Sequence, residues 1–413
     1  MLPAPLISLA LGLLGGCPAN PTHCVLRNVP PDSVGMSADR LATISHVADR
    51  GLDARGYPGI AVVVGRHGGL VWEHGYGFLD WDTTSAAVDP TRTMYDLASL
   101  TKVIATTTAI MVLYDEHRIH LDDPVSKYLR AYRRGAKREV TIRMLLEHRA
   151  GLPPGRNVYR RGRSSAKARQ MILATSLEYP PDEREVYSDV GADVLGFVVE
   201  AVSGQRLDDF VRSHVSRPLG MKSTMFRPPR ALRARIAPTE IASSRGHPLR
   251  GEVHDETADA LGGVAGNAGL FATAADLAVF AQMMLDGGTY HGVRIVRDST
   301  VALFTRRTSG WRALGWETCS GGASCGRYMS DVAYGHTGFT GTSIWIDPES
   351  DLFVIVLANR MHELPDGRAP ESAVLADVRA DIADLAELSV ADDSVRRDMP
   401  DAMRADLAIG WMP

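Results

Sequence analysis

The segment Ser99-Leu100-Thr101-Lys102 decides how this chain is interpreted, because it places a hydroxyl group and an amine three residues apart. An apolar pattern of helical period follows directly, over residues 103–114. Residues three apart lie on one face of a helix, so the spacing predicts that Ser99 and Lys102 lie side by side. Ser99 is expected in or near the first turn, where backbone N–H groups lack intrahelical partners and the helix dipole is positive.

A serine and a lysine in this arrangement can act as a nucleophile and its base. A serine hydroxyl is a poor nucleophile unless a neighbouring group takes its proton. A lysine can take it only when neutral, and at an ordinary pKa of ~10.4 about one lysine in 2,500 is neutral at pH 7. Chemistry at Ser99 therefore requires the pKa of Lys102 to fall by ~3 units, through burial and nearby positive charge. On its own, Ser-x-x-Lys also occurs on solvated helix faces.

Two further motifs lie downstream of this pair. Tyr187-Ser188-Asp189 comes just ahead of a helical pattern, and a phenol beside a lysine can relay protons between a nucleophile and a leaving group. His336-Thr337-Gly338, followed by Phe339-Thr340-Gly341, opens the strand-rich end of the chain, where small residues would let a substrate lie along a strand edge. Taken singly, Tyr187 and His336 also fit purely structural roles.

The order of the three motifs resembles the serine β-lactamase and penicillin-binding-protein superfamily, whose motifs include S-x-x-K, S-D-N and K-T-G. Within it, the sequence is most similar to the class C β-lactamase-like serine hydrolases and esterases. Residues 145–153 resemble the family segment Leu-Leu-x-His-x-x-Gly-Leu-Pro, and residues 262–281 resemble a second family stretch, rich in glycine and alanine. The resemblance covers roughly residues 36–362.

The resemblance implies a role for each matching residue. Ser99 would be the acylated nucleophile, Lys102 its base partner and Tyr187 the second proton-transfer group. The backbone N–H groups of Ser99 and Phe339 would form the oxyanion hole, in which one donor is worth ~3 to 4 kcal/mol in known cases. No metal or cofactor is implied. The substrate-binding residues implied are Asp189, Asn267, His336, Thr337 and Gly338.

Two motifs depart from the family pattern. Asp189 stands where class C β-lactamases have an asparagine that contacts substrate amide groups, and Val190 follows it, so the motif is not Ser-Asp-Asn either. His336 replaces a permanently charged lysine by a group with an ordinary pKa of ~6.5, which binds a substrate carboxylate less well. These departures point away from a dedicated β-lactamase.

The sequence therefore predicts an exported serine hydrolase that forms an acyl-enzyme at Ser99 and acts on a small-molecule ester, amide or peptidoglycan-derived substrate. An esterase is the leading prediction, and a D-Ala-D-Ala carboxypeptidase or β-lactamase is the alternative on the same machinery. A non-catalytic sensor of cell-wall fragments is an alternative from a different class. Loss of Ser99 or Lys102 would favour that sensor, and both residues are present.

The fold expected is α/β (α+β), with an antiparallel sheet flanked by helices, because strand patterns lie at both ends of the sequence and helical ones between them. Strands and helices do not alternate, so a doubly wound parallel sheet is not expected. We predict a sheet domain from residues 25–103 and 256–395, an all-helical insertion over 104–255 and a tail over 396–413. Strand patterns cover 59–65, 70–76, 342–346 and 352–357, and helical patterns cover 37–51, 103–114, 141–148, 191–202, 207–215, 273–285 and 376–388.

Composition narrows the class of protein. The chain has 413 residues, 45% of them hydrophobic and 23% charged, which is typical of a soluble globular protein. Lys plus Arg number 45 and Asp plus Glu number 49, for a formal net charge of −4. Nucleic-acid binders are usually basic, so no nucleic-acid partner is expected.

The first residues resemble an export signal. Residues 1–24 are predicted to be a signal or lipoprotein leader, because residues 6–14 are apolar but shorter than the ~20 residues that span a bilayer. Leu14-Gly15-Gly16-Cys17 resembles a bacterial lipobox, so Cys17 is a candidate for a membrane tether. The basic stretch that normally precedes such a segment is missing. The expected location is periplasmic or at the cell surface.

Two other clusters contain residue types that can bind metals or form disulfides. Cys319 and Cys325 bracket a flexible run, and they fit either a disulfide or two free thiols, but not a zinc site. His254-Asp255-Glu256 has adjacent rather than spaced ligands, so we interpret it as a loop near the entrance of the site.

Overall fold

The computed structural model describes residues 26–158, 164–241, 244–319 and 323–391. The predicted leader, with Cys17, and the predicted C-terminal tail lie outside the described residues. Within the described part of the chain, no helix is both long and apolar enough to cross a bilayer.

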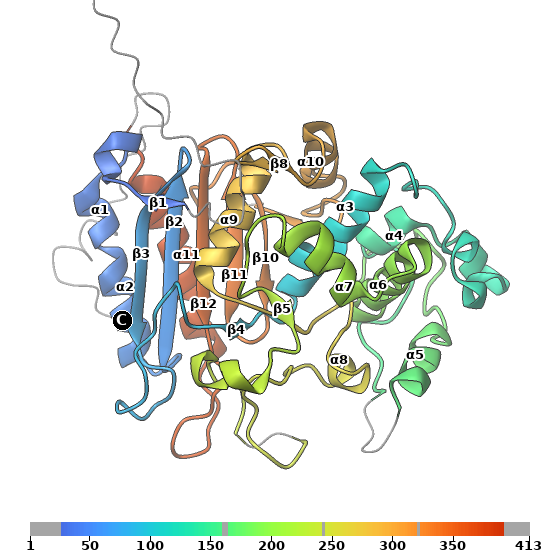
Figure 1. The fold of residues 1–413 in the computed structure, drawn as a ribbon, viewed down its shortest axis with the longest axis horizontal. Helices are drawn as coiled ribbons and strands as arrows, with labels where there is room; N and C mark the ends of the chain where they lie inside the picture. Colours follow the sequence, from blue (N-terminus) through green and yellow to red (C-terminus); the bar gives the residue numbers. More distant parts are fainter. Residues whose placement is uncertain (1–25, 159–163, 242–243, 320–322, 392–413) are drawn as a thin grey trace, which may run out of the picture.

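Seven strands form the central sheet, in the order β1-β3-β2-β12-β11-β10-β9. Neighbouring strands are antiparallel except β1 and β3. β2 pairs with β12, so the two ends of the chain meet at the middle of the sheet, as predicted (Figure 1). The strands are β1 (Arg27–Asn28), β2 (Gly59–Arg66), β3 (Gly69–Gly77), β9 (Glu317–Thr318), β10 (Tyr334–Gly338), β11 (Thr342–Asp347) and β12 (Leu352–Ala358).

Helices cover both faces of the sheet, which explains why β2 is apolar from Gly59 to Gly65. Successive side chains of a strand point to opposite faces. Val62 and Val64 therefore pack in the core under α1 (Ala38–Ala42), α2 (Ile44–Asp53) and α11 (Ser372–Leu388). Ala61 and Val63 pack in a second, larger core with α9 (Ala274–Leu285). That core continues into the helical region, so sheet and helices share one interior.

The insertion between the sheet segments is mainly helical, as predicted. Two expected helices contain π-helical turns: η3 (Lys102–Thr107) precedes α3 (Thr108–Asp115), and η7 (Arg212–Ser216) follows α7 (Leu207–Val211). Its other helices are α4 (Ile142–Leu146), α5 (Ser165–Leu173) and α6 (Asp189–Ser203), with the short turns η4 (Val125–Lys127), η5 (Arg130–Tyr132), η6 (Gly135–Glu139) and η8 (Arg230–Arg235); α8 (Glu256–Ala260) follows at its end.

A small three-stranded sheet joins the insertion to the segment that carries the predicted nucleophile. β6 (Leu270–Ala272) pairs with β4 (Tyr95–Asp96) on one side and with β5 (Met225–Phe226) on the other. β5 is a strand inside the region predicted as all-helical. The remaining elements are η2 (Pro31–Val34), β7 (Thr289–Tyr290), β8 (Val293–Arg294), α10 (Asp298–Thr305) and η9 (Ala323–Cys325).

Local capping signals place several helix ends where the sequence indicates them. Ser37 begins α1 by accepting a hydrogen bond from the Arg40 N–H, although the predicted helix 37–51 divides at Thr43 into α1 and α2. Thr141 caps α4 in the same way. Gly204 ends α6 with a φ of 74°, in the left-handed region that glycine adopts without strain.

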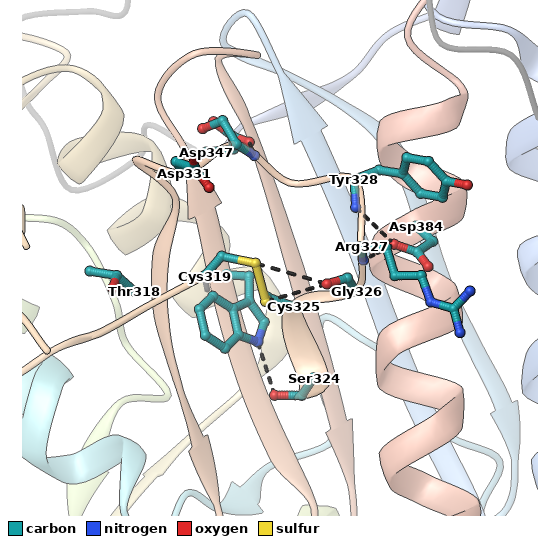
Figure 2. Close-up of a disulfide and its surroundings, with 12 residues drawn as sticks. Thr318, Cys319, Ser324, Cys325, Gly326, Arg327, Tyr328, Asp331, Asp347 and Asp384 are labelled. Carbon is teal, nitrogen blue, oxygen red and sulfur yellow. Dashed lines mark hydrogen bonds between the residues drawn. A yellow bond between two sulfur atoms is a disulfide. The ribbon is translucent and has the colours of Figure 1, made fainter. Parts of the chain in front are cut away.

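Cys319 and Cys325 form a disulfide beside the outer strands of the sheet (Figure 2). The Trp345 indole N–H donates to Ser324 Oγ at 3.2 Å, inside the loop that the disulfide closes. The backbone N–H groups of Arg327 and Tyr328 donate to the Asp384 carboxylate on α11, which holds the loop against that helix. Of the two states left open by the sequence, the cysteines adopt the bonded one.

Close packing of α6 leaves no room for a side chain at Gly266. A Cβ atom there would lie 2.0 Å from the carbonyl oxygen of Ala192 on α6. We predict that Gly266→Ala lowers the free energy of unfolding by about 1–3 kcal/mol, as overpacking does in other cores. Gly155→Ala is the control, because its Cβ meets nothing within 4 Å. Urea unfolding with equal midpoints for the two variants would contradict the prediction.

Candidate active site

Ser99 lies in the turn between β4 and η3, and a buried carboxylate holds that turn. Asp96 is 1% exposed; its Oδ1 accepts from the Ala98 N–H at 2.9 Å and its Oδ2 from the His254 N–H at 2.6 Å. Ala98 has a φ of 45°, an uncommon conformation for a residue with a side chain. Burial raises the pKa of Asp96 to about 6, although both hydrogen bonds oppose the shift. Asp96 thus joins the nucleophile turn to the loop of His254.

Lys102 is only 4% exposed, and its ammonium group contacts three oxygens from three segments. Nζ lies 2.9 Å from Ser99 Oγ, which confirms that the spacing of three brings the two side chains together. It donates to the Asn267 carbonyl oxygen at 3.2 Å and pairs with Asp189 Oδ1 at 2.7 Å. A charged amine buried this deeply is tolerated because each of its protons meets an acceptor.

The pKa of Lys102 shifts in the direction opposite to the one expected. Burial pulls it down, but the electrostatic interactions and side-chain hydrogen bonds of Tyr187 and Asp189 outweigh burial and raise the Lys102 pKa above the ordinary value. A lowered pKa would require burial together with neighbouring positive charge. Asp189, in place of asparagine, puts a negative charge against the lysine instead, so the expected lowering of the Lys102 pKa is wrong.

Tyr187 is held by a neutral histidine that the motif analysis assigned no role. His148 Nδ1 accepts from the Ser188 N–H at 3.0 Å, and the His148 ring lies 4.6 Å from the Tyr187 ring. Burial, with the charges of Arg312 and Lys102, lowers the pKa of His148 well below its ordinary value. A neutral imidazole is required here, because a protonated one could not accept the Ser188 hydrogen bond.

Ser188 gives the Tyr187 segment its second anchor. Its Oγ accepts from the Gly191 N–H at 3.1 Å, which caps α6, and donates to the Pro153 carbonyl oxygen at 2.6 Å. The phenol of Tyr187 is thereby presented beside Lys102, whose Nζ lies 5.0 Å from the ring centroid. The serine of this motif therefore has a structural role.

β10 lies next to the nucleophile turn, but His336 on it is buried. The imidazole is 2% exposed, with Nδ1 2.7 Å from the Thr337 carbonyl oxygen and its ring 6.0 Å from that of Tyr187. Burial lowers its pKa, against the influence of Glu317, so the ring is neutral. His336, Thr337 and Gly338 are not among the residues that line the cavity above Ser99.

A glycine is required at position 338 because β10 lies very close to the segment that precedes Ser99. A Cβ atom at this position would lie 2.4 Å from the Leu97 carbonyl oxygen and 2.1 Å from Thr342 Oγ1. Thr342 Oγ1 itself donates to that carbonyl oxygen at 3.0 Å. Glycine therefore lets the end of β10 approach the turn that carries Ser99.

The two backbone groups predicted for the oxyanion hole are free to bind a substrate oxygen. Among the described residues, no hydrogen-bond acceptor is found for the N–H groups of Ser99 and Phe339. The Phe339 side chain is 57% exposed at the cavity, and the Arg360 guanidinium lies 4.8 Å from its ring centroid. The oxyanion hole stays a prediction that this arrangement supports.

A cavity of about 610 Å³ opens above Ser99 and brings most of the predicted site together. Apart from Asp189, its charged side chains come from loops that the motifs did not single out as substrate contacts. Asn267 Oδ1 is buried there with no hydrogen-bond partner among the described residues. The predicted residues that line the cavity are Ser99, Tyr187, Asp189, Asn267 and Phe339, and the added charged ones are Arg156, Glu240, Arg245, Asp255 and Glu256.

The loop of His254 lines this cavity, as expected. Asp255 is the N-cap of α8, where its Oδ1 accepts from the Ala258 N–H at 2.7 Å. In the part of the chain that the structure describes, no group of three or more His, Cys, Asp or Glu side chains could hold a metal ion.

A buried lysine touching a serine, a tyrosine beside them and free backbone donors at a strand end define a serine hydrolase that works by acyl transfer. The Beta-lactamase family model matches residues 44–378, and the chain belongs to that family. Proteins of Salmonella typhimurium and Salmonella schwarzengrund named "Putative D-alanyl-D-alanine carboxypeptidase" are each 36% identical over 379 residues, covering 82% of this chain and 87% of theirs.

Solved structures share the fold at lower sequence identity. EstCE1, a hydrolase with promiscuous acyltransferase activity, has a TM-score of 0.66 and 22% identity, covering 84% of this chain and 99% of its own. The octameric penicillin-binding protein homologue of Pyrococcus abyssi has a TM-score of 0.65 and 22% identity, covering 86% and 79%. A class C β-lactamase of Rhodobacter sphaeroides has a TM-score of 0.63 and 21% identity, covering 83% and 97%.

Lys102 and Tyr187 are expected to act together in transferring the proton of Ser99. We predict that Lys102→Ala and Tyr187→Phe each lower kcat/KM for an activated ester by about 10²-fold or more. The double variant should lose much less than the product of the two factors, because groups that act as a unit are not additive. Lys167→Ala, on an exposed face of α5, is the control and should retain full activity. Full additivity in steady-state kinetics would mean that the two groups have separate roles.

Proposed function

We propose that the protein is a carboxypeptidase of the D-Ala-D-Ala type, which removes the C-terminal residue of a peptide through an acyl-enzyme at Ser99. The observation that carries this proposal is the charge of the cavity lining, which includes Arg156, Arg245, Glu240 and Asp255 besides the nucleophile. A peptide end brings amides and a carboxylate that such side chains can bind, whereas an apolar acyl chain gains nothing from them. The name carried by the relatives at 36% identity supports the same substrate class.

In this reaction Ser99 Oγ attacks the carbonyl carbon of the penultimate residue. The electron pair moves onto the carbonyl oxygen, which the N–H groups of Ser99 and Phe339 stabilise. The proton of Ser99 passes to the Tyr187–Lys102 pair, and the same pair returns a proton to the departing amine nitrogen as its C–N bond breaks. Water then hydrolyses the acyl ester and returns Ser99 to its starting state.

An esterase is the second candidate, and the position of His336 favours it. Where relatives have a charged lysine, this side chain is neutral, 2% exposed and outside the cavity lining. β10 therefore supplies no cation for a substrate carboxylate, and a neutral ester loses nothing by that. A non-catalytic sensor is less favoured, because Lys102 Nζ lies 2.9 Å from Ser99 Oγ, within hydrogen-bond distance of the nucleophile.

We further propose that the protein is exported. The predicted leader and the lipobox-like Cys17 motivate this location, and the Cys319–Cys325 disulfide supports it, because disulfides persist in oxidising compartments. An exported hydrolase of this kind would meet peptidoglycan-derived peptides outside the cytoplasm.

A three-substrate comparison separates the candidate activities. We expect the protein to release D-alanine from a D-Ala-D-Ala peptide with a kcat/KM above those for a short-chain nitrophenyl ester and a chromogenic cephalosporin, because the peptide engages the charged cavity walls. Amino-acid analysis and absorbance give the three rates. Ester turnover without release of D-alanine would identify an esterase, and fast cephalosporin turnover a β-lactamase.

The acyl-enzyme can be observed directly on the nucleophile. We predict that a fluorophosphonate or labelled penicillin modifies Ser99, and that Ser99→Ala abolishes both labelling and turnover, because Ser99 Oγ lies 2.9 Å from Lys102 Nζ. Ser244→Ala, which changes another cavity-lining serine, is the matched control and should still be labelled. Peptide mass spectrometry that finds the adduct on any other residue would contradict the assignment.

A further inference from the structure

Asp189 is the first residue of α6, and its carboxylate pairs with a lysine far less exposed than itself. Oδ1 lies 2.7 Å from Lys102 Nζ; the Asp189 side chain is 35% exposed at the cavity and that of Lys102 is 4% exposed. The family resemblance puts an asparagine at this position, which carries no charge. The substitution therefore adds one negative charge in direct contact with the amine that touches the nucleophile.

The histidines and Asp193 around Lys102 do not supply this charge. His148, after α4, and His336, on β10, are neutral because burial lowers the pKa of each. Asp193, one turn along α6, is fully buried, burial raises its pKa well above the ordinary value, and its Oδ1 accepts from the Asn267 N–H at 3.1 Å. Tyr187 also favours the ammonium form, because it lies beside Lys102 and shares a side-chain hydrogen bond with it, but it brings no carboxylate.

Arg312 is a second cation near the Tyr187 ring, and two carboxylates already balance it. Its Nε donates to Glu185 at 2.8 Å and its second nitrogen to Glu317 at 3.0 Å. The guanidinium lies 5.4 Å from the Tyr187 ring centroid. Among the described residues, Asp189 is thus the ionised carboxylate in contact with the Lys102 ammonium.

We propose that Asp189 is a positioning residue, whose carboxylate holds Lys102 as an ammonium ion against Ser99 in the resting enzyme. An opposite charge in contact favours the charged form of a lysine by one to three pH units in comparable pairs. The ammonium then donates to Ser99 Oγ and to the Asn267 carbonyl oxygen, which sets the direction of the serine hydroxyl. The proposal concerns the same site as the proposed function and rests on it for the catalytic use of Lys102.

A merely structural role for Asp189 makes a different prediction. An acidic residue in the first turn of α6 stabilises the helix through its dipole, whatever the charge on Lys102. Asp189→Asn keeps the shape and the capping capacity of the side chain and removes only its charge. The ionisation of Lys102 therefore distinguishes the two roles.

The chain contains only five lysines, so their ionisation can be followed one by one. We would label the lysine ε-carbons with ¹³C, record NMR spectra from pH 6 to pH 11.5, and assign Lys102 by the signal missing in Lys102→Arg. In the wild type, Lys102 should keep its charge after Lys137 has titrated, because burial and Arg156 lower the pKa of Lys137. In Asp189→Asn, the midpoint of Lys102 should fall by at least one pH unit.

Three further variants complete the experiment. Asp189→Glu should restore the high midpoint, because it returns the carboxylate. Asp122→Asn removes an exposed carboxylate that pairs with Arg143, and it should leave the Lys102 midpoint unchanged. In the pH profile of kcat/KM for an activated ester, the midpoint of the alkaline limb should move to lower pH in Asp189→Asn but not in Asp189→Glu or Asp122→Asn. If Asp189→Asn does not fold, as judged by circular dichroism, the wild-type titration and Asp189→Ser decide the question.

A wild-type Lys102 that is neutral below pH 9, or an identical midpoint in Asp189→Asn, would overturn the proposal. The NMR titration needs no substrate and no turnover. Failure of the proposed carboxypeptidase activity would therefore leave this result intact, and the two failures are distinguishable.

Discussion

A single buried ammonium group organises this molecule. Lys102 is almost completely removed from water, and a charge in that position requires an acceptor for each of its protons. The three oxygens come from the nucleophile turn, from the first turn of α6 and from the loop that carries Asn267. Sheet, helical region and loop are thus held around the amine, and the geometry of the site follows from satisfying its charge.

Burial shifts the pKa of two other ionisable groups near this site, Asp96 and His148. Asp96 takes hydrogen bonds from both the nucleophile turn and the loop at the cavity entrance, so the position of Ser99 is coupled to that loop. His148 must be neutral to hold the Ser188 backbone, and burial beside Arg312 and Lys102 keeps it so. Each group loses its ordinary pKa because solvent is replaced by fixed partners.

Much of the cavity lining lies outside the three motifs. His336 on β10 is buried, whereas Arg156, Glu240 and Arg245 line the cavity beside Ser99, Tyr187 and Asp189. Loops vary more freely than the strands that position them, so one fold can serve different substrates. Under the proposed function, the charges of these loops set the balance between peptides and esters.

The sequence alone predicted features that depend on neighbours along the chain, namely the contact of Ser99 with Lys102 and the helix starts at residues 37 and 141. The order of strand and helix patterns also predicted that the two chain ends meet in one sheet. Among the residues that line the cavity it predicted Ser99, Tyr187, Asp189, Asn267 and Phe339, but it placed His336 with them and expected a lowered pKa at Lys102. Those features depend on Asp189, 87 positions from the lysine, and on burial beneath Tyr187. Only the tertiary structure decides them, because electrostatic shifts depend on distance in space and on the exclusion of water, neither of which a linear pattern contains.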